Sequence, residues 1–332
     1  MHLPYPARKD SNPALFQPRS SNSRGSGMPF SKGLTLPRRY RQHGIVLIVF
    51  VLVALVWILT HGSGSGSRHG GPVGTANHVP SGTPPAVIVT VLDENRFGAK
   101  YTALLKENRK LYAEKYGYET FFPNVGDYEL LSAPSSWTKV VAMRHAMTKF
   151  PDATYLWYVD VDTFIMSPHQ SIDKDVMATA KLEEKMIVDH PVVPPDSIIH
   201  TFSHLRGEDV DLVLTQDKQG LVTSTFVLRN SEWSRFFLET WFDPIYRSYN
   251  FQKAETHALE HIVQWHPTIL SKLALVPQRT INSYSSASRG EEYQTGDLAV
   301  RFPACTKSSK SPTCEAEAEP YAMVWRSAFR NR

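Results

Sequence analysis

Residues 155–166 read YLWYVDVDTFIM, and our interpretation of the chain starts from this stretch. Its first half is apolar, aromatic and rich in strand-forming residues, so it predicts a buried β-strand. Asp160 and Asp162 follow, and in an extended chain their side chains point to the same side. Two carboxylates at the end of a buried strand need a positive partner. Such oxygen ligands suit a hard divalent cation whose remaining ligands are phosphates.

Other interpretations of Asp160 and Asp162 fit less well. An EF-hand would have Gly and Glu where this chain has Ile165 and Ser171. An aspartate-based phosphatase would have Asp-x-Asp-x-Thr, but Thr163 comes one position early. No glycine-rich phosphate loop of the P-loop or dinucleotide type occurs in the sequence. A metal and sugar-nucleotide site is therefore the favoured hypothesis, with the phosphatase as an alternative.

Strand and helix patterns alternate on both sides of this stretch. A β-branched run at 86–92 predicts a strand buried on both faces, and a helix is expected at 98–116, ending at Gly117. A second strand at 119–122 and a helix at 137–150 lead into the stretch itself. This order predicts an α/β fold with a doubly wound sheet, which binds ligands at the carboxyl ends of its strands.

The later part of the chain shows weaker patterns. We expect strands at 210–215, 221–228 and 273–276, helices at 231–246 and 255–265, and a loop or partly ordered tail at 305–320. Helical spacing predicts core positions for Trp233, Trp241 and Trp265. His257 and His261 are four residues apart on one predicted helix and could share a metal, but a surface or acceptor-groove position is favoured.

The chain divides into four predicted segments. Residues 1–43 are a Pro-, Ser- and Arg-rich tail that predicts disorder, and 44–60 are an uncharged apolar run that predicts a membrane anchor. Residues 61–85 are a Gly/Ser/Pro-rich stem, and 86–332 form the folded domain. Arginines flank the anchor on its N-terminal side, so the positive-inside rule predicts a cytosolic tail and a luminal domain, a single-pass type II topology.

Charge and cysteine content limit the possible functions. The net charge is +4, but residues 1–43 hold eight Lys/Arg against one Asp, so the rest of the chain has 28 basic and 31 acidic residues. We therefore expect no nucleic-acid partner for the folded domain. Cys305 and Cys314 are too sparse for a zinc site, and in an oxidising compartment they could form one disulfide or remain free.

Six ordered blocks carry a resemblance to a known family. They are Trp137–Lys139, Tyr155–Met166, Ser224–Ser234, Ala258–His261, Val276–Tyr284 and Gly296–Cys305. Together they resemble the fungal and plant family of Golgi α-1,2-galactosyl-, α-1,6-mannosyl- and xyloglucan xylosyltransferases. The chain looks most similar to the α-1,6-mannosyltransferase subunits of the fungal mannan polymerase complex.

The resemblance implies a GT-A fold (a Rossmann-like α/β glycosyltransferase fold), a retaining reaction, and Mn²⁺ or another divalent cation as cofactor. It implies a nucleotide-sugar donor, GDP-mannose with UDP-galactose as the less favoured choice, and a mannan or N-glycan acceptor. It also implies a Golgi membrane location and other mannosyltransferase subunits as partners. The competing hypothesis is a catalytically weak subunit that stabilises such a complex.

Site roles are carried over from matching positions. Asp160 would contact the ribose and the metal, and Asp162 would be a direct metal ligand. Lys139 resembles a nucleotide-binding position, and an exposed helix lysine is the alternative. Asp217 falls where the family has an acidic residue at the sugar site, although a turn Asp capping its own backbone is equally compatible. Glu255 corresponds to the acidic member of an acidic-Gln pair whose glutamine amide is thought to face the reacting sugar, and we expect Glu255 to have a catalytic role.

Three positions depart from the family pattern. Arg301 replaces a histidine metal ligand, and arginine cannot bind a metal because it stays protonated. It could grip the donor diphosphate directly, or the metal site could be weak. Thr256 replaces the glutamine of the acidic-Gln pair, and 222–225 replace an Asn-x-Gly-Ser block of the acceptor pocket.

Overall fold

The computed structural model describes residues 78–193, 197–249, 251–287, 290–303, 305 and 312–330. Residues 1–73 and 74–332 form two separate units, and the fold described below belongs to the second. The predicted tail, the predicted anchor and most of the predicted stem lie outside the described residues. Within the described residues, no helix has the length and apolar character needed to cross a membrane.

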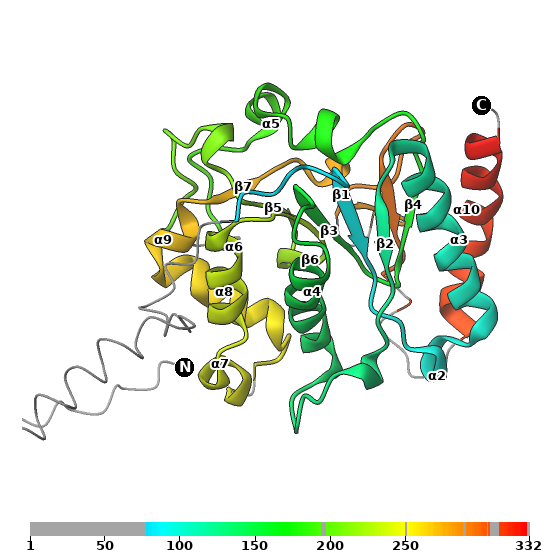
Figure 1. The fold of residues 1–332 in the computed structure, drawn as a ribbon, viewed down its shortest axis with the longest axis horizontal. Helices are drawn as coiled ribbons and strands as arrows, with labels where there is room; N and C mark the ends of the chain where they lie inside the picture. The colour runs from blue at the N-terminus through cyan, green and yellow to red at the C-terminus, as the bar shows by residue number, and fades with distance from the viewer. Residues whose placement is uncertain are drawn as a thin grey trace, which may run out of the picture. The chain divides into compact units, whose positions relative to one another are not determined.

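A six-stranded mixed sheet forms the centre of the fold, in the order β2-β1-β3-β6-β5-β7 (Figure 1). Its strands are β1 (Ala86–Val89), β2 (Glu119–Phe121), β3 (Tyr155–Val159), β5 (Leu212–Asp217), β6 (Gly220–Arg229) and β7 (Leu273–Leu275). Strand β6 runs antiparallel to both of its neighbours, while the other pairs are parallel. The predicted α/β class is confirmed, and β6 makes the sheet mixed rather than wholly parallel.

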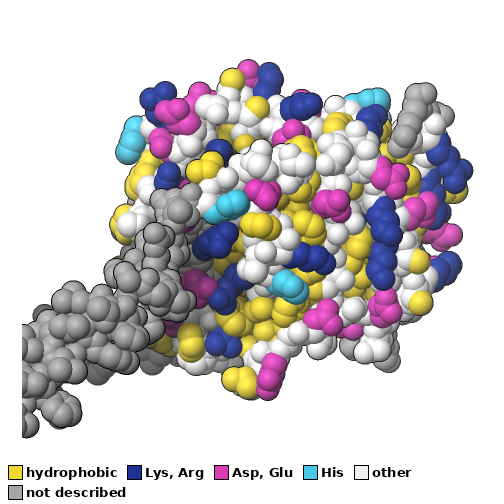
Figure 2. Space-filling view, viewed as in Figure 1, with side chains coloured by type: hydrophobic (Ala, Val, Ile, Leu, Met, Phe, Trp, Pro, Cys, Tyr) yellow, Lys and Arg dark blue, Asp and Glu magenta, His cyan; other side chains and the backbone are white. Residues whose placement is uncertain are grey.

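Successive side chains along each strand point to opposite faces of the sheet, so a hydrophobic core forms on each face. Val87, Val89, Leu156 and Tyr158 belong to one core, while Ala86, Ile88, Trp157 and Val159 belong to the other. Helices α4 (Thr138–Lys149), α6 (Glu232–Trp241) and α8 (Glu255–Trp265) cover the first face. Helices α3 (Ala99–Tyr116) and α10 (Pro312–Arg330) cover the second. On the face in Figure 2, acidic and basic side chains are interspersed.

A smaller three-stranded sheet lies next to the site, in the order β4-β9-β8. It consists of β4 (Thr163–Ile165), β8 (Ser283–Tyr284) and β9 (Ala299–Arg301). The chain passes from β3 into β4 through residues 160–162, and Thr163 pairs with Arg301 in the antiparallel register of β4 and β9. This pairing brings Arg301, the last residue of β9, next to the turn that carries Asp160 and Asp162.

Short elements complete the described part of the fold. They are helices α2 (Glu94–Phe97), α5 (Thr179–Lys185), α7 (Pro244–Ser248) and α9 (Pro267–Leu270), the π-helix η4 (Ile172–Val176), and the 3₁₀ turns η2 (Val125–Asp127), η3 (Ser135–Trp137), η5 (Gly207–Asp209) and η6 (Gln278–Thr280).

Local signals located most of the early elements correctly. Helix α3 ends where Gly117 adopts the left-handed conformation, with φ 68°, and donates its N–H to the carbonyl of Ala113. The single helix predicted at 231–246 is wrong, because α6 ends at Trp241 and α7 begins at Pro244. The Asp243 carboxylate accepts the N–H of Ile245 and caps the new helix.

Two further sequence predictions need correction. The predicted loop or partly ordered tail at 305–320 is wrong from Pro312 onward, where α10 begins, and residues 306–311 lie outside the described residues. Ala318, Trp325 and Phe329 lie on one face of that helix and are buried against the core of α3. Trp241 is buried as predicted, but Trp265 is 71% exposed and does not pack in the core.

A disulfide joins Cys305 to Cys314 and ties the segment after β9 to the first turns of α10. The sequence alone left this pairing open. Because both cysteines are buried in the same core as Trp325, the bond fixes α10 against the smaller sheet.

Candidate active site

A tight turn, rather than the end of a straight strand, carries the two aspartates. Strand β3 ends at Val159, and the Asp160 N–H still bonds the Ser224 carbonyl of β6 at 2.8 Å. The chain then turns, and the Thr163 N–H donates to the Asp160 carbonyl at 3.2 Å. The alternation expected of an extended chain therefore does not apply to Asp160 and Asp162, and the two side chains have different partners.

Two buried side chains of α3 hold this turn. Arg109 donates from Nη2 to the carbonyls of Asp160, at 2.8 Å, and Thr163, at 2.6 Å. The Tyr101 hydroxyl donates to the Val161 carbonyl at 2.8 Å. Burial lowers the pKa of Arg109 to about 10, so it is still charged at neutral pH. Sequence reasoning missed both residues, because a buried arginine within a helix gives no distinctive local pattern.

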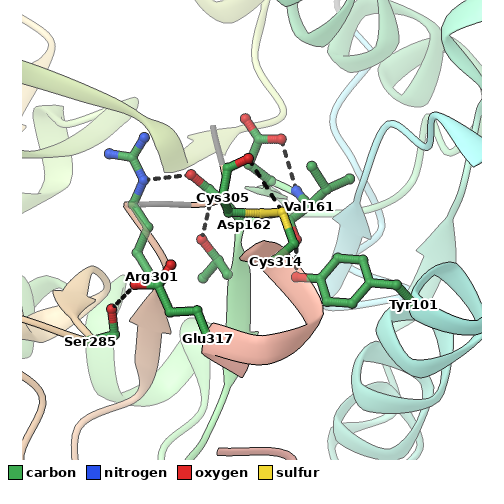
Figure 3. The surroundings of a disulfide bond; sticks show 10 residues. Tyr101, Val161, Asp162, Ser285, Arg301, Cys305, Cys314 and Glu317 are labelled. Atoms are coloured by element: carbon green, nitrogen blue, oxygen red, sulfur yellow. Dashed lines mark hydrogen bonds and ion pairs between the residues drawn. A yellow bond between two sulfur atoms is a disulfide. The ribbon is translucent and has the colours of Figure 1, made fainter. Parts of the chain in front are cut away.

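Asp162 forms a buried ion pair with Arg301. Its side chain is fully buried, with Oδ2 at 2.8 Å from Arg301 Nε and Oδ1 accepting the Thr163 hydroxyl at 3.1 Å. Burial raises the pKa of the Asp162 carboxyl, and Arg301 opposes that shift. Burial also disfavours the charge of Arg301, but Asp162 outweighs it and raises the pKa of the guanidinium. Figure 3 shows this pair next to the Cys305–Cys314 disulfide.

Asp160 and Glu255 share the ammonium group of Lys139. Lys139 Nζ lies 2.9 Å from Glu255 Oε1 and 3.5 Å from Asp160 Oδ2, and it donates to the Thr223 carbonyl at 3.3 Å. Burial lowers the pKa of Lys139, but Glu255 and then Asp160 outweigh it, and the net shift is upward. The alternative of an exposed helix lysine is therefore wrong, because the side chain is buried between two carboxylates and above the Tyr158 ring.

A hydrogen-bonded chain connects Asp217 to Arg301. Asp217, at the end of β5, accepts the Tyr284 hydroxyl on Oδ2 at 2.7 Å, and Arg301 Nη1 donates to the same hydroxyl at 3.0 Å. The Asp217 Oδ1 atom also caps its own turn by accepting the Gln219 N–H. The turn-capping interpretation is therefore confirmed, and the same residue lines the pocket described below, while its role toward a sugar stays a prediction. Tyr284 was not foreseen as a member of the site.

These side chains line a pocket of about 350 Å³, large enough to be a ligand site. Its charged lining residues are Asp93, Arg96, Lys139, Asp160, Asp217, Lys253, Glu255 and Arg301. Asp162 does not line it, because Arg301 covers its carboxylate. A second pocket of about 440 Å³ shares Asp217 with the first.

One carboxylate oxygen in this pocket lacks a partner. Glu255 Oε2 is buried and has no hydrogen bond among the described residues, while Oε1 binds Lys139. The Thr223 and Thr256 hydroxyls each lie 3.5 Å from Glu255 Oε1 and 2.7 Å from each other. A buried, unpaired carboxylate oxygen is costly, so Glu255 is suited to accept a hydroxyl group from a ligand.

The expected metal site does not fit these residues. Both Asp162 oxygens are already hydrogen-bonded, and Lys139 occupies the space between Asp160 and Glu255. Among the residues that the structure describes, no three His, Cys, Asp or Glu side chains converge as a possible metal site. His257 and His261 are half-buried on α8, where His257 faces Glu260 at 3.9 Å. The geometry therefore favours the side chains of Lys139 and Arg301, rather than a metal ion, as the partners of the carboxylates at this turn.

Comparison with known proteins identifies the family. Residues 82–312 match the galactosyl transferase GMA12/MNN10 family. The chain belongs to this family. The resemblance seen in the six sequence blocks is therefore confirmed, and the family membership supports a glycosyltransferase.

Relatives in this family carry two kinds of name. An uncharacterized α-1,2-galactosyltransferase of Schizosaccharomyces pombe is 26% identical over 302 residues, covering 86% of this chain and 91% of that protein. The probable α-1,6-mannosyltransferase MNN11 of Saccharomyces cerevisiae is 27% identical over 258 residues, covering 70% of this chain and 60% of that protein. Three further S. pombe relatives are matched over only 56% to 60% of their length. The relatives therefore do not separate a galactose donor from a mannose donor.

A solved structure with a similar chain trace is a glycosyltransferase involved in the glycosylation of the major capsid of PBCV-1. It is 12% identical, with a TM-score of 0.47, and the match covers 72% of this chain and 99% of that one.

Proposed function

We propose that this chain is a retaining, GT-A-type hexosyltransferase that transfers mannose from GDP-mannose to a mannan or N-glycan acceptor with α linkage. The family membership supports sugar transfer. The observation that carries the proposal is the pocket beyond β3, where the buried cations Lys139 and Arg301 lie among Asp160, Asp217 and Glu255. Cations suit a diphosphate, and carboxylates suit sugar hydroxyls.

The negatively charged diphosphate of the donor is held by cationic side chains of the pocket. Lys139 and Arg301 both line the pocket and bind the diphosphate of the donor. Asp160, whose Oδ1 already accepts the Val161 N–H, has its Oδ2 edge on the pocket for a ribose hydroxyl. As the sugar–phosphate bond breaks, negative charge grows on the diphosphate, and the two preorganised cations stabilise it.

The sugar and the acceptor meet on the carboxylate side of the pocket. Glu255 Oε2 accepts a hydroxyl of the transferred hexose, and Asp217, shared by the two pockets, orients the reacting sugar and the acceptor. Retention follows from front-side attack. The acceptor oxygen bonds to the anomeric carbon as the bond to the phosphate oxygen breaks, and the departing phosphate takes the acceptor's proton.

The proposed location is the Golgi membrane, with the folded domain in the lumen. The apolar run at 44–60 and the arginines before it support a type II anchor. The Cys305–Cys314 disulfide agrees with an oxidising compartment. Other mannosyltransferase subunits are the proposed partners.

A second candidate function is α-1,2-galactosyl transfer from UDP-galactose. Two S. pombe relatives that are named α-1,2-galactosyltransferases favour it. A catalytically weak subunit is the remaining alternative. It is motivated by Arg301 and Thr256, which depart from the family pattern of histidine and glutamine.

A donor screen tests these proposals. The full-length chain, purified in detergent alone and with co-expressed subunits, is incubated with radiolabelled GDP-mannose or UDP-galactose and an α-mannose oligosaccharide. We expect transfer from GDP-mannose and its loss in Glu255→Gln. Transfer from UDP-galactose only would establish the second candidate. Donor binding without transfer under any condition would leave the weak-subunit function.

A further inference from the structure

We propose that Arg301, together with Lys139, takes the place of a divalent cation in this chain, so that the donor diphosphate binds directly to protein cations without a metal. The inference rests on the proposed function, because it concerns the same pocket. It also explains why the two aspartates at residues 160 and 162 do not converge on one ligand.

Arg301 blocks access to Asp162 from the pocket. Asp162 is fully buried and does not line the pocket, whereas Arg301 does. A metal ion arriving from the pocket meets the guanidinium before it meets the carboxylate. To bind Asp162 it must break a 2.8 Å ion pair and leave a buried arginine unpaired beside a second cation. Separating one partner from a buried ion pair is strongly unfavourable.

The other carboxylates near the turn already have a cationic partner. Lys139 Nζ contacts both Asp160 and Glu255, so an ammonium group already bridges the acids that a metal would need. Arg109 adds a further buried charge beneath the turn, bonded to the Asp160 carbonyl. Asp160 and Glu255 are thus paired with Lys139, and Asp162 is paired with Arg301. Each of these three carboxylates already has a cationic partner, so a metal would have to displace one.

The guanidinium of Arg301 is held in a fixed orientation at the pocket. Nε is anchored by Asp162 and Nη1 by the Tyr284 hydroxyl, while Nη2 has no hydrogen bond among the described residues. In Figure 3 the terminal nitrogens point away from the disulfide. A guanidinium held at Nε and Nη1 still presents the remaining N–H groups of Nη1 and Nη2 for a phosphate, and arginine binds phosphate oxygens in pairs. Since the side chain is only 15% exposed, this donor is preorganised.

The experiment is a calorimetric titration of the full-length wild-type chain with GDP and UDP, once in EDTA and once in MnCl₂. We expect dissociation constants that agree within about twofold between the two conditions. Binding that weakens by about tenfold or more in EDTA would overturn the inference while leaving the donor pocket intact. If neither nucleotide binds in either condition, both the inference and the proposed function fail.

Matched variants sharpen the test. Arg301→His exchanges the fixed cation for a neutral metal ligand, so GDP binding should weaken about tenfold to a hundredfold in EDTA and recover in MnCl₂. Arg301→Lys should bind GDP more weakly than wild type and show no response to MnCl₂. Arg279→Lys is the control, because Arg279 forms an ion pair with Asp297 away from the pocket.

Circular dichroism melting identifies any variant that does not fold. If a variant fails to fold, the comparison of wild-type binding in EDTA and in MnCl₂ still decides whether the diphosphate binds without a metal. The inference is overturned if Arg301→His binds GDP in EDTA as tightly as wild type does.

Discussion

Replacing Lys139 with methionine removes a buried charge while keeping a side chain of similar shape. Its Nζ lies 2.9 Å from Glu255 Oε1 and 3.5 Å from Asp160 Oδ2, and the side chain is buried. Without it, two carboxylates lose their shared cation, and one of them is buried. Breaking a buried ion pair by removing one partner costs about 3–5 kcal/mol. For a domain of this size that lowers the melting temperature by roughly 6–20 °C.

The assay is thermal melting followed by circular dichroism, with Lys139→Met, Glu255→Gln and the double variant compared with wild type. Because Glu255→Gln removes the charge that Lys139 neutralises, the double variant should melt well above Lys139→Met. The double variant should still fail to bind GDP. A Lys139→Met protein that melts within about 2 °C of wild type would refute the reasoning, since the pair would then contribute under about 1 kcal/mol.

The same pair has a defined pH dependence. The pKa of Lys139 in the folded chain is raised above its ordinary value of 10.5. Its contribution is therefore fully present below that value and is lost only as the pH rises through the higher folded pKa. The difference in melting temperature between wild type and Lys139→Met should stay constant between about pH 7 and pH 9 and shrink above about pH 10.5. A difference that disappears below about pH 9 would contradict the assigned charge state.

Substitutions at four other residues test features outside the ion pairs, each by thermal melting. Gly220→Ala should destabilise the fold by about 1–3 kcal/mol, because Gly220 has φ +130° and an added Cβ would lie 2.0 Å from Glu260 Oε1. Cys305→Ser or Cys314→Ser should cost about 2–3 kcal/mol through the lost loop closure, and reducing agent should then have no further effect. Trp325→Ala should cost about 3–5 kcal/mol, whereas Trp325→Phe should be far milder, because the buried Trp325 indole N–H has no partner among the described residues.

Local patterns were sufficient for most of the first half of the domain. The strand at β3, the helix at α3 and its end at Gly117 were all correctly predicted from the sequence. The reason is that alternation, helical periodicity and a left-handed glycine act within a few residues of chain. The same patterns pointed to Asp160 and Asp162 as site candidates, because charged residues after a buried strand are unusual.

Contacts between distant parts of the chain decided the strand order of the sheet and the position of α10. Strand β6 lies between β3 and β5 and runs against both, an order that no local pattern encodes. Helix α10 was missed because its buried face depends on a core supplied by α3, more than 200 residues earlier in the chain.

The sequence by itself determined the α/β class, the position of the acidic turn and the family. Only the tertiary structure decided which cationic side chains pair with the carboxylates of that turn. Arg301 lies 139 residues from Asp162, and the two meet because β4 and β9 pair in one register. Burial then makes their charges depend on each other, since an acid removed from water must keep its partner. The sequence shows that Asp162 and Arg301 are present, and the fold makes them one ion pair.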